Sequence, residues 1–276
     1  MKPIMEVDGL TVRYGDGCVY CLSTDSKLEK NRCPECKTVW AVRNVSLQLY
    51  ESEILGVVGE SGSGKTTLMR SLYFDMPVTS GKAFLSCYEG GKSDIFQVSS
   101  QQQRVIRNNL LGMVYQNPMM GLLMDYSSGG NIAQKLIAAG NRNVAAMQSR
   151  TSELLKHMEI PVSRVKEPPK NFSGGMQQRV QISKALANNP PILFLDEVTT
   201  GLDLSVQAKV LDLIRLVCKT LNISIIIVSH DLAVIRMLSD RTIVMLDGQI
   251  VEHGLTDQLL EDPQHPFTQI LVHSLI

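Results

Sequence analysis

The feature that most constrains this chain is the stretch Ile54–Arg70, with the sequence ILGVVGESGSGKTTLMR. It begins with a short apolar run, passes through a glycine-rich turn and ends in a segment that we expect to be helical from Lys65 onward. The turn fits the pattern G-x-x-x-x-G-K-[ST]. Such a turn converges backbone N–H groups on a polyphosphate at the positive end of a helix. A strand, a turn and a helix around a bound nucleoside triphosphate are therefore predicted.

The residues of this turn have distinct expected roles. Lys65 reaches the outer phosphates, and the hydroxyl of Thr66 holds Mg²⁺. The other candidates for contact with the nucleotide are Gly59, Ser61, Gly62, Ser63, Gly64 and Thr67. The alternative is an ordinary strand, turn and helix rich in glycine and serine, which accounts less well for the full pattern and its flanking elements.

The composition limits the class of protein. The chain has 276 residues, of which 44% are apolar, enough for one large α/β domain or two small ones. The 27 Lys and Arg residues balance the 27 Asp and Glu residues, which argues against a nucleic-acid partner. The N-terminal residues lack the apolar region of a secretory signal peptide, and the longest apolar runs have the length of strands. Neither secretion nor a membrane span is therefore expected. We therefore expect a cytoplasmic protein with reduced cysteines.

Four cysteines form two C-x-x-C pairs separated by eleven residues: Cys18, Cys21, Cys33 and Cys36. This spacing favours a tetrahedral structural Zn²⁺ site, in which each pair forms a tight knuckle. Four unrelated thiols, two disulfides or an iron–sulfur cluster are the alternatives. Cys87 and Cys218 stand apart and are interpreted as ordinary buried or half-buried thiols.

Two apolar runs end in residues suited to phosphate chemistry. Pro191–Glu197, PILFLDE, is expected to be a central parallel strand. Asp196 at its carboxyl end is expected beside the phosphate-binding turn, where it orders Mg²⁺, and Glu197 is placed to polarise a water molecule. The run Ile223–Ser229 ends in His230, which we expect near the γ-phosphate. A strand capped by solvated acids and a structural histidine are the alternatives.

Two further segments are weaker candidates. Ser173, Gly174 and Gly175 open a predicted helix, where bare N–H groups and a hydroxyl favour an anion, although the same pattern suits a simple helix cap. Tyr14 ends the predicted strand Ile4–Tyr14 and is a candidate to stack on adenine. Half-buried packing is the alternative for this tyrosine.

Taken in order along the chain, these motifs resemble those of the ATP-binding-cassette ATPases. The series comprises the phosphate-binding turn, Gln116 after a short strand, FSGGMQQR, FLDE, Asp203 and SHD. The resemblance covers essentially the whole chain and implies an α/β P-loop NTPase with a RecA-like core, an antiparallel β subdomain and a helical subdomain. It implies one ATPase domain over residues 1–276, with the helical subdomain at 117–172. The four-cysteine zinc-knuckle insertion, at 15–40 within the β subdomain, is absent from the family pattern.

The resemblance also implies roles for individual residues in ATP hydrolysis. Glu197 is the catalytic base, His230 the γ-phosphate switch and Lys65 the third catalytic residue. Thr66, Gln116 and Asp196 form the Mg²⁺ set. The implied contacts to ATP outside the turn are Tyr14, Gln116, Ser173, Gly174, Gly175, Gln177, Asp196 and Asp203.

The family resemblance places the Ser173–Gly175 segment against the ATP that a second subunit holds. One chain then carries two half-sites, and two cassettes sandwich two ATP molecules, either as a homodimer or with a different paired ATPase. Closure by ATP and opening after hydrolysis supply the mechanical step.

Three stretches, among them GLDLSVQAKVLDLI, resemble the peptide and nickel importer subfamily. The segment that follows Gln116, NPMMGLLMDYSSGGNIAQKLIAAG, instead resembles the K component of the phosphonate carbon–phosphorus (C–P) lyase machinery. Because cassettes meet their partners through this segment, the resemblance implies docking on a C–P lyase core complex. An importer subunit bound to a membrane permease is the alternative. A zinc-bearing DNA-repair cassette is a remoter one, since it needs a basic face.

Overall fold

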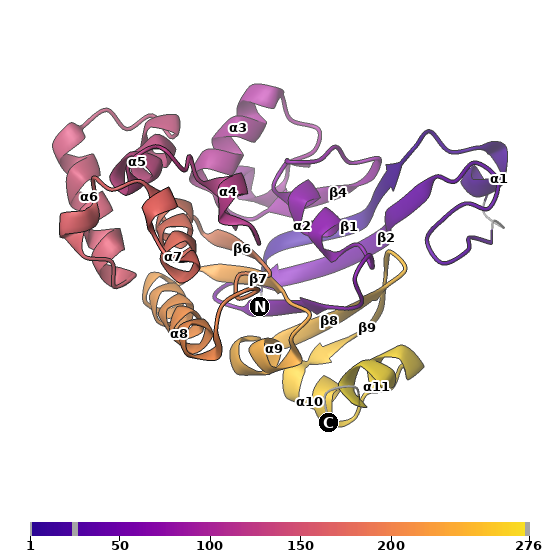
Figure 1. The fold of residues 1–276 in the computed structure, drawn as a ribbon. Helices are drawn as coiled ribbons and strands as arrows, with labels where there is room; N and C mark the ends of the chain where they lie inside the picture. The colour runs from indigo at the N-terminus through magenta and orange to yellow at the C-terminus, as the bar shows by residue number, and fades with distance from the viewer. Residues whose placement is uncertain (1, 24–26, 274–276) are drawn as a thin grey trace. The chain divides into compact units, whose positions relative to one another are not determined.

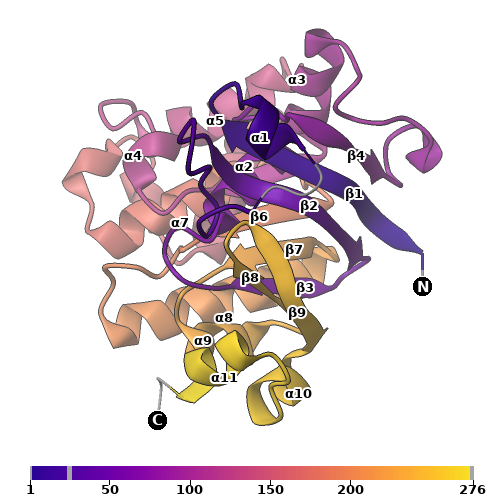
Figure 2. The ribbon, with the colours of Figure 1, turned by 90° about the vertical axis from the view of Figure 1, so that its right-hand side faces the viewer.

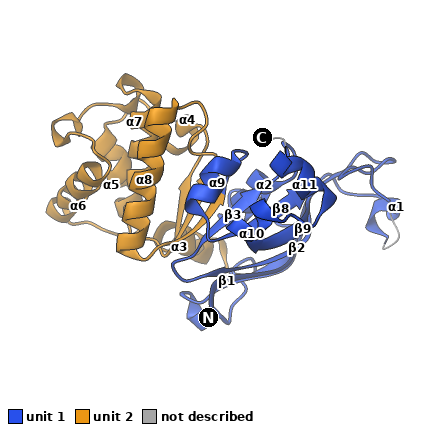
Figure 3. Ribbon diagram, turned by 90° about the horizontal axis from the view of Figure 1, so that it is seen from below, with its two compact units in different colours: residues 1–98, 228–276 blue, residues 99–227 orange. Residues whose placement is uncertain are grey.

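The computed structural model of the chain describes residues 2–23 and 27–273. Residues 24–26, which fall within the expected insertion, and the terminal residues 1 and 274–276 lie outside the described residues. The chain forms two compact units, shown in separate colours in Figure 3. Unit 1 comprises residues 1–98 and 228–276, and unit 2 comprises residues 99–227.

Unit 1 contains an antiparallel sheet of three strands in the order β2-β1-β4, which Figure 2 shows in indigo and purple. The strands are β1 (Pro3–Tyr14), β2 (Val39–Tyr50) and β4 (Ser80–Leu85). Apolar side chains along β1, such as Met5, Val7 and Leu10, are buried, while Glu6 and Asp8 between them are exposed. The predicted strand at Ile4–Tyr14 is confirmed, with one residue added at its start.

The insertion lies between β1 and β2, at the tip of this hairpin (Figure 1). It contains a single helical turn, α1 (Val19–Leu22), and short bridges that join Glu29 to Arg32 and Arg32 to Val39. A four-residue helix is far shorter than a helix that is stable in isolation, so other contacts must hold it.

A second group of strands in unit 1 carries the phosphate-binding turn. The strand β3 (Ile54–Val58) pairs in parallel with β8 (Arg241–Leu246), which pairs in antiparallel fashion with β9 (Gln249–Leu255). The helix α2 (Lys65–Leu72) begins at the predicted residue, and a tight turn at Asp247–Gly248 joins β8 to β9. The other helices of this unit are η1 (Glu89–Gly91), α9 (Leu232–Leu238), α10 (Thr256–Glu261) and α11 (Pro266–His273).

Unit 2 contains the strands β5 (Leu111–Val114), β6 (Ile192–Asp196) and β7 (Ser224–Val228). They lie side by side in that order, and the last residues of β7 mark the boundary of the unit. Every residue of these strands is buried, apart from slight exposure of Met113, as expected for strands that are covered on both faces. The pair β5–β6 is parallel, with Leu111 opposite Ile192.

The helices of unit 2 precede, separate and follow these strands along the chain. They are α3 (Ser100–Asn109), α4 (Pro118–Gly121), α5 (Ser128–Ala138), α6 (Val144–His157), η2 (Val162–Arg164), η3 (Pro169–Asn171), α7 (Gly174–Ala185) and α8 (Leu204–Leu221). The expected helical subdomain, residues 117–172, thus contains α4, α5 and α6. Its independence as a body stays a prediction.

Across residues 2–23 and 27–273, no helix combines the length and the apolar character that crossing a bilayer requires.

The buried ring of Phe194, at the middle of β6, provides a test of the core of unit 2. Phe194 has no solvent exposure, so Phe194→Ala should lower the free energy of unfolding by about 3–5 kcal/mol. The matched control is Leu216→Ala, because the side chain of Leu216 is 63% exposed and its removal should change the free energy by less than about 0.5 kcal/mol. Urea unfolding followed by circular dichroism measures both, and equal effects of the two substitutions would contradict the assignment of β6 to the core.

Candidate functional site

The phosphate-binding turn is shaped by backbone packing that only glycine permits. Gly64, the N-cap of α2, has φ 101°, and a Cβ placed on it would lie 1.9 Å from the carbonyl oxygen of Ala41. Gly59 has φ 149°, and its Cβ would lie 2.1 Å from the carbonyl oxygen of Met245. Both ends of the turn are therefore pressed against the backbone of neighbouring strands, which fixes the direction of its N–H groups.

The ammonium group of Lys65 lies at the centre of this turn. The residue is only 6% exposed, and its Nζ donates to the carbonyl oxygens of Gly59 at 2.9 Å and Glu60 at 2.8 Å. Ser63 Oγ lies 3.4 Å from the same nitrogen. The turn thus combines a buried positive charge with the N-terminus of α2, an arrangement suited to a polyphosphate.

The remaining candidates in unit 1 lie around this turn or after β7. Ser61, Gly62 and Thr66 are exposed, and Thr67 is half-buried. The side chain of Tyr14 is 47% exposed, and its hydroxyl lies 3.3 Å from Thr67 Oγ1 on α2. The structure therefore places Tyr14 beside the start of α2, and its role at adenine stays a prediction.

In unit 1, His230 is exposed and follows the strand β7, as predicted from the apolar run before it. The following residue, Asp231, caps α9 by accepting a hydrogen bond from the backbone N–H of Ala233.

In unit 2, the end of β6 brings together two residues that the motifs assigned separately. Gln116 Nε2 donates to Glu197 Oε2 at 2.8 Å, and Thr200 Oγ1 donates to the same oxygen at 3.4 Å. Glu197 has φ 45°, a left-handed conformation that costs a glutamate free energy and is held here by buried neighbours on both sides, Asp196 and Val198. The carboxylate of Glu197 is thereby fixed by its backbone and by the amide of Gln116.

The predicted position of Asp196 beside the phosphate-binding turn stays a prediction, because the turn belongs to unit 1 and Asp196 to unit 2. Within its own unit, Asp196 is 4% exposed at the carboxyl end of β6.

The glycine-rich helix start is also in unit 2. Ser173 is the N-cap of α7 and is exposed together with Gly174. A Cβ on Gly175 would lie 2.4 Å from Val206 Cγ1, so this glycine permits α7 to approach α8 closely. The side chain of Gln177 points toward the segment before α7, since its Nε2 donates to the carbonyl oxygens of Pro169 at 3.0 Å and Phe172 at 3.1 Å.

Asp203, which the resemblance assigns to ATP contact, has a structural role within unit 2. Its Oδ1 accepts hydrogen bonds from Ser205 Oγ at 2.7 Å and from the backbone N–H of Val206 at 3.0 Å, which caps α8. The hydrogen bond from Ser205 is the largest cause that lowers the pKa of Asp203, followed by that from Val206. The carboxylate is exposed and charged at neutral pH.

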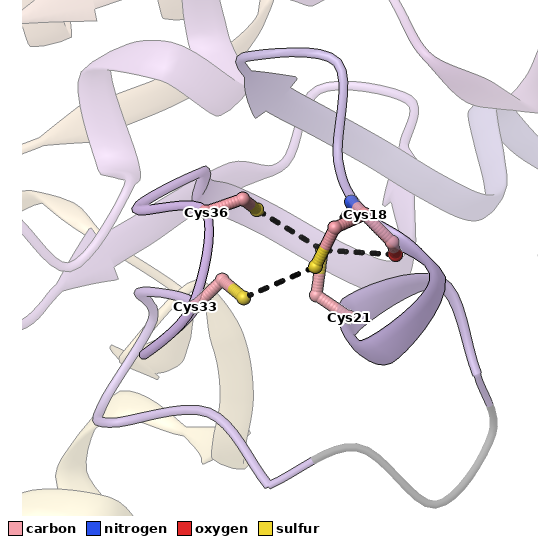
Figure 4. A group of neighbouring side chains, drawn as sticks. All are labelled: Cys18, Cys21, Cys33 and Cys36. Atoms are coloured by element: carbon pink, nitrogen blue, oxygen red, sulfur yellow. Dashed lines mark hydrogen bonds between the residues drawn. The ribbon is translucent and has the colours of Figure 1, made fainter.

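The four cysteines of the two C-x-x-C pairs converge at one point in unit 1 (Figure 4). Their sulfur atoms all lie within 4.8 Å of one another, and three of the separations, Cys18–Cys21, Cys18–Cys33 and Cys21–Cys36, are 3.7–3.8 Å. Tetrahedral ligands about 2.3 Å from a single zinc ion have sulfur atoms about 3.8 Å apart. The cluster therefore fits one tetrahedral ion.

The cluster geometry also bears on the alternatives to zinc. All four thiols are free, so the disulfide alternative is wrong. A cluster of several irons interposes inorganic sulfide and spreads its thiolates more widely than a single ion does, which disfavours that alternative. Within the cluster the two shifts are opposite: the pKa of Cys36 is lowered to about 6, chiefly by hydrogen bonds with Thr38, whereas the pKa of Cys18 is raised, with burial as the largest cause that raises it.

The two cysteines outside the cluster differ from each other. Cys218 is buried, and burial raises its pKa to about 12, as expected for an ordinary core thiol. Cys87 is exposed, so its interpretation as a buried or half-buried thiol is wrong. It follows β4 on the outer edge of the sheet, a position that a lone cysteine in the sequence does not reveal.

Two asparagines near these sites were not indicated by any motif. Asn31, between the two pairs of cysteines, donates from Nδ2 to the carbonyl oxygen of Gly62 in the phosphate-binding turn at 3.4 Å. Asn131, fully buried at the start of α5, accepts from the N–H of Leu123 at 2.8 Å and donates to its carbonyl oxygen at 3.0 Å. Both contacts depend on the tertiary path of the chain, and local patterns do not encode them.

Comparison with known proteins supplies the context for this geometry. The sequence profile of the ABC transporter family matches residues 42–200. The ATP-binding protein PhnK of Escherichia coli (strain K12), named for phosphonates utilization, is 44% identical over 84% of this chain and 90% of PhnK. The oligopeptide transport ATP-binding protein OppD of Bacillus subtilis (strain 168) is 39% identical over 86% of this chain and 67% of OppD.

Among solved structures, the chain is similar to the ATP-binding cassette MJ0796, in a dimer described as a post-hydrolysis state bound to ADP and Pi. The TM-score is 0.76 at 26% identity, over 91% of this chain and 98% of MJ0796. The fold agrees with that of MJ0796, the family profile covers more than half of the chain, and the chain is an ATPase of the ABC transporter family.

Proposed function

We propose that the chain is an ATP-hydrolysing subunit that pairs with a second cassette around two ATP molecules and couples hydrolysis to a phosphonate C–P lyase core complex. The paired cassette is a second copy of this chain or a different ATPase, and the complex works in the cytoplasm. The observation that carries the choice of partner is the agreement with PhnK, which extends over 90% of PhnK, whereas OppD is matched over 67% of its length.

The proposed roles at the nucleotide follow from the geometry within each unit. In unit 1, the turn from Gly59 to Thr67 binds the phosphates of ATP, with Lys65 as the cation and Thr66 as a Mg²⁺ ligand. Tyr14 stacks on adenine, supported by its half-exposed ring beside Thr67. His230 contacts the γ-phosphate.

In unit 2, Asp196 orders Mg²⁺ and Glu197 acts as the general base for the attacking water. The hydrogen bond from Gln116 to Glu197 holds the base and joins it to the segment that follows Gln116. A partner that moves this segment therefore acts on the base directly, which supports coupling between docking and hydrolysis.

The proposed dimer is supported by the dimeric structures of MJ0796 and by the helix start at Ser173–Gly175. The exposed Ser173 and Gly174 at the N-terminus of α7 form a second anion-binding site, which we propose contacts the ATP held by the paired cassette. Asp203, exposed at the start of α8, lines the seam between the cassettes.

The proposed docking segment follows Gln116 and is unusually apolar for an exposed surface. Met119, Met120, Leu123 and Tyr126 are 67%, 56%, 42% and 64% exposed. The buried amide of Asn131 binds both backbone groups of Leu123 and so gives this segment a defined shape. Exposed apolar patches on a defined segment are typical of protein interfaces, and methionine is common in them.

A peptide importer is the second candidate, because the similarity to OppD and to dipeptide transport ATP-binding proteins is also high. In that case the same apolar segment docks on a membrane permease. The two candidates share the ATP chemistry and differ only in the partner.

We also propose that the cluster of Cys18, Cys21, Cys33 and Cys36 holds one structural Zn²⁺. The convergence of the four sulfur atoms and their separations support a single tetrahedral ion. The metal would stabilise an insertion whose one helical turn is too short to be stable alone.

The assignment of the base is tested with Glu197→Gln. Removal of the carboxylate should lower the rate of phosphate release by about 10²–10⁴-fold, while ATP still binds and the closed dimer accumulates. Lys65→Ala, the contrasting variant, should weaken ATP binding itself because it removes the buried cation. Phosphate release and light scattering with ATP measure the two effects, and turnover by Glu197→Gln at the parental rate would show that the base is assigned wrongly.

The metal site is tested by elemental analysis of single-cysteine variants. The parent should contain about one zinc per chain. Cys33→Ser should release the metal, because it removes one of the four ligands and a buried part of the cluster. Cys87→Ser, an exposed cysteine outside the cluster, is the control and should retain zinc. Iron in place of zinc, or an unchanged zinc content in Cys33→Ser, would overturn the Zn²⁺ proposal.

The partner is tested by affinity purification of the tagged chain from its native cells. C–P lyase subunits should be recovered with the parent, and Met120→Lys should lose them while it retains ATP hydrolysis. Val144→Lys, at another exposed apolar residue of unit 2 (61% exposed), is the control and should retain the partner. Recovery of permease subunits without lyase subunits would favour the importer instead.

A further inference from the structure

The cysteine cluster and the phosphate-binding turn are joined by a side chain that belongs to the insertion. Asn31 lies between the two pairs of cysteines, and its carbonyl oxygen accepts a hydrogen bond from the backbone N–H of Trp40 at 2.7 Å. Its side-chain Nδ2 donates to the carbonyl oxygen of Gly62 at 3.4 Å. One residue is thus fixed to the start of β2 by its backbone and to the tip of the turn by its side chain.

The contact reaches the turn at its least supported point. A Cβ placed on Gly62 meets no heavy atom of the described chain within 4 Å, and Gly62 has φ 83°. The neighbouring residues Ser63 and Gly64 are instead held tightly, since Gly248 N–H donates to the carbonyl oxygen of Ser63 at 3.1 Å and Gly64 packs against Ala41. The orientation of the Gly62 peptide therefore depends on Asn31 more than that of its neighbours does.

A second path runs from the cluster to the same turn through the backbone. The backbone N–H of Cys33 donates to the carbonyl oxygen of Thr38 at 2.9 Å, and Cys36 Sγ lies 3.2 Å from Thr38 Oγ1. Thr38 is buried, and three residues later the carbonyl oxygen of Ala41 contacts Gly64. The second knuckle therefore sets the position of the strand against which the turn packs.

The position of Asn31 depends in turn on what holds the cluster together. Among residues 15–23 and 27–40, the buried apolar side chains are those of Cys21 and Cys33, and the helix α1 is a single turn. Four sulfur atoms within 4.8 Å of one another repel one another as thiolates unless a cation lies among them. A metal ion would thus order the loop that carries Asn31.

We infer that metal occupancy of the cysteine cluster and nucleotide binding at the phosphate-binding turn are thermodynamically coupled, with Asn31 as the positioning residue between them. The inference rests on the proposed metal site and on the proposed phosphate-binding role of the turn. Because coupling between two binding sites is reciprocal, the metal should raise the affinity for nucleotide and the nucleotide should raise the affinity for metal by the same factor.

The experiment compares the zinc-loaded and the zinc-stripped full chain. Binding of the fluorescent nucleotide mant-ADP with Mg²⁺ is titrated, since a diphosphate reports on the turn without requiring the paired cassette. The loaded chain should bind about 2- to 10-fold more tightly, the range expected from one hydrogen bond. Transfer of zinc to the chelator 4-(2-pyridylazo)resorcinol should become less favourable by the same factor when ADP and Mg²⁺ are saturating.

Two variants separate the positioning role from general stability. Asn31→Ala should keep its zinc, by elemental analysis, yet bind mant-ADP as weakly as the stripped parent. Arg32→Ala, at the neighbouring exposed residue, is the control and should retain both zinc and the parental affinity. If stripping unfolds the chain, the comparison of these two zinc-loaded variants alone decides, and parental affinity in Asn31→Ala overturns the inference.

Other outcomes distinguish this inference from the proposed function. Equal mant-ADP affinity of loaded and stripped chains overturns the coupling while the metal site and the ATPase role stand. A chain that binds no zinc overturns both the coupling and the metal site, while phosphate release still reports the ATPase. Reciprocal shifts in the two affinities that Asn31→Ala abolishes support the coupling.

Discussion

The close approach between the phosphate-binding turn and the start of β2 is the constraint on which the rest of unit 1 depends. Gly64 leaves no room for a side chain against the carbonyl oxygen of Ala41, and neither does Gly248, whose Cβ position would lie 2.5 Å from the carbonyl oxygen of Trp40. Three segments distant in the sequence thus meet backbone to backbone. Because backbones in contact cannot shift independently, the N–H groups of the turn keep one direction, and preorganised donors of this kind do not need to reorient when phosphate binds.

In unit 2, a glycine likewise permits a close approach between two segments, at the glycine-rich start of α7. Gly175 lets α7 approach Val206 of α8, while Asp203 caps α8 through the N–H of the same valine. The exposed Ser173 is therefore presented by two helices that are fixed against each other. At the end of β6, the positive φ of Glu197 is maintained by buried residues on either side. In both places the groups suited to chemistry lie at the ends of rigid elements, which keeps their geometry well defined.

Much of this architecture is encoded locally and could be predicted. The start of α2 at Lys65 and the strands that precede Gln116, Glu197 and His230 follow from apolar runs bounded by turn residues. The spacing of the cysteines likewise predicted their convergence. Contacts between a loop and a distant backbone could not be predicted, as for Asn31 with Gly62 or Asn131 with Leu123, because an asparagine in a polar stretch is compatible with many partners. The exposure of Cys87 was missed because it depends on which strand lies at the sheet edge.

The strength of the contact between Asn31 and Gly62 limits what the insertion can do. A single neutral hydrogen bond contributes about 0.5–1.5 kcal/mol, and the separation of 3.4 Å places this one toward the weak end. A structural zinc site contributes far more to the folding of the segment that holds it. Only the part of that free energy that differs between the nucleotide-bound and nucleotide-free turn can be transmitted, because a ligand shifts an equilibrium by no more than its differential affinity. The coupling that we infer would therefore adjust nucleotide affinity over a narrow range. The residues to which we assign ATP hydrolysis, such as Lys65 and Glu197, lie outside the insertion.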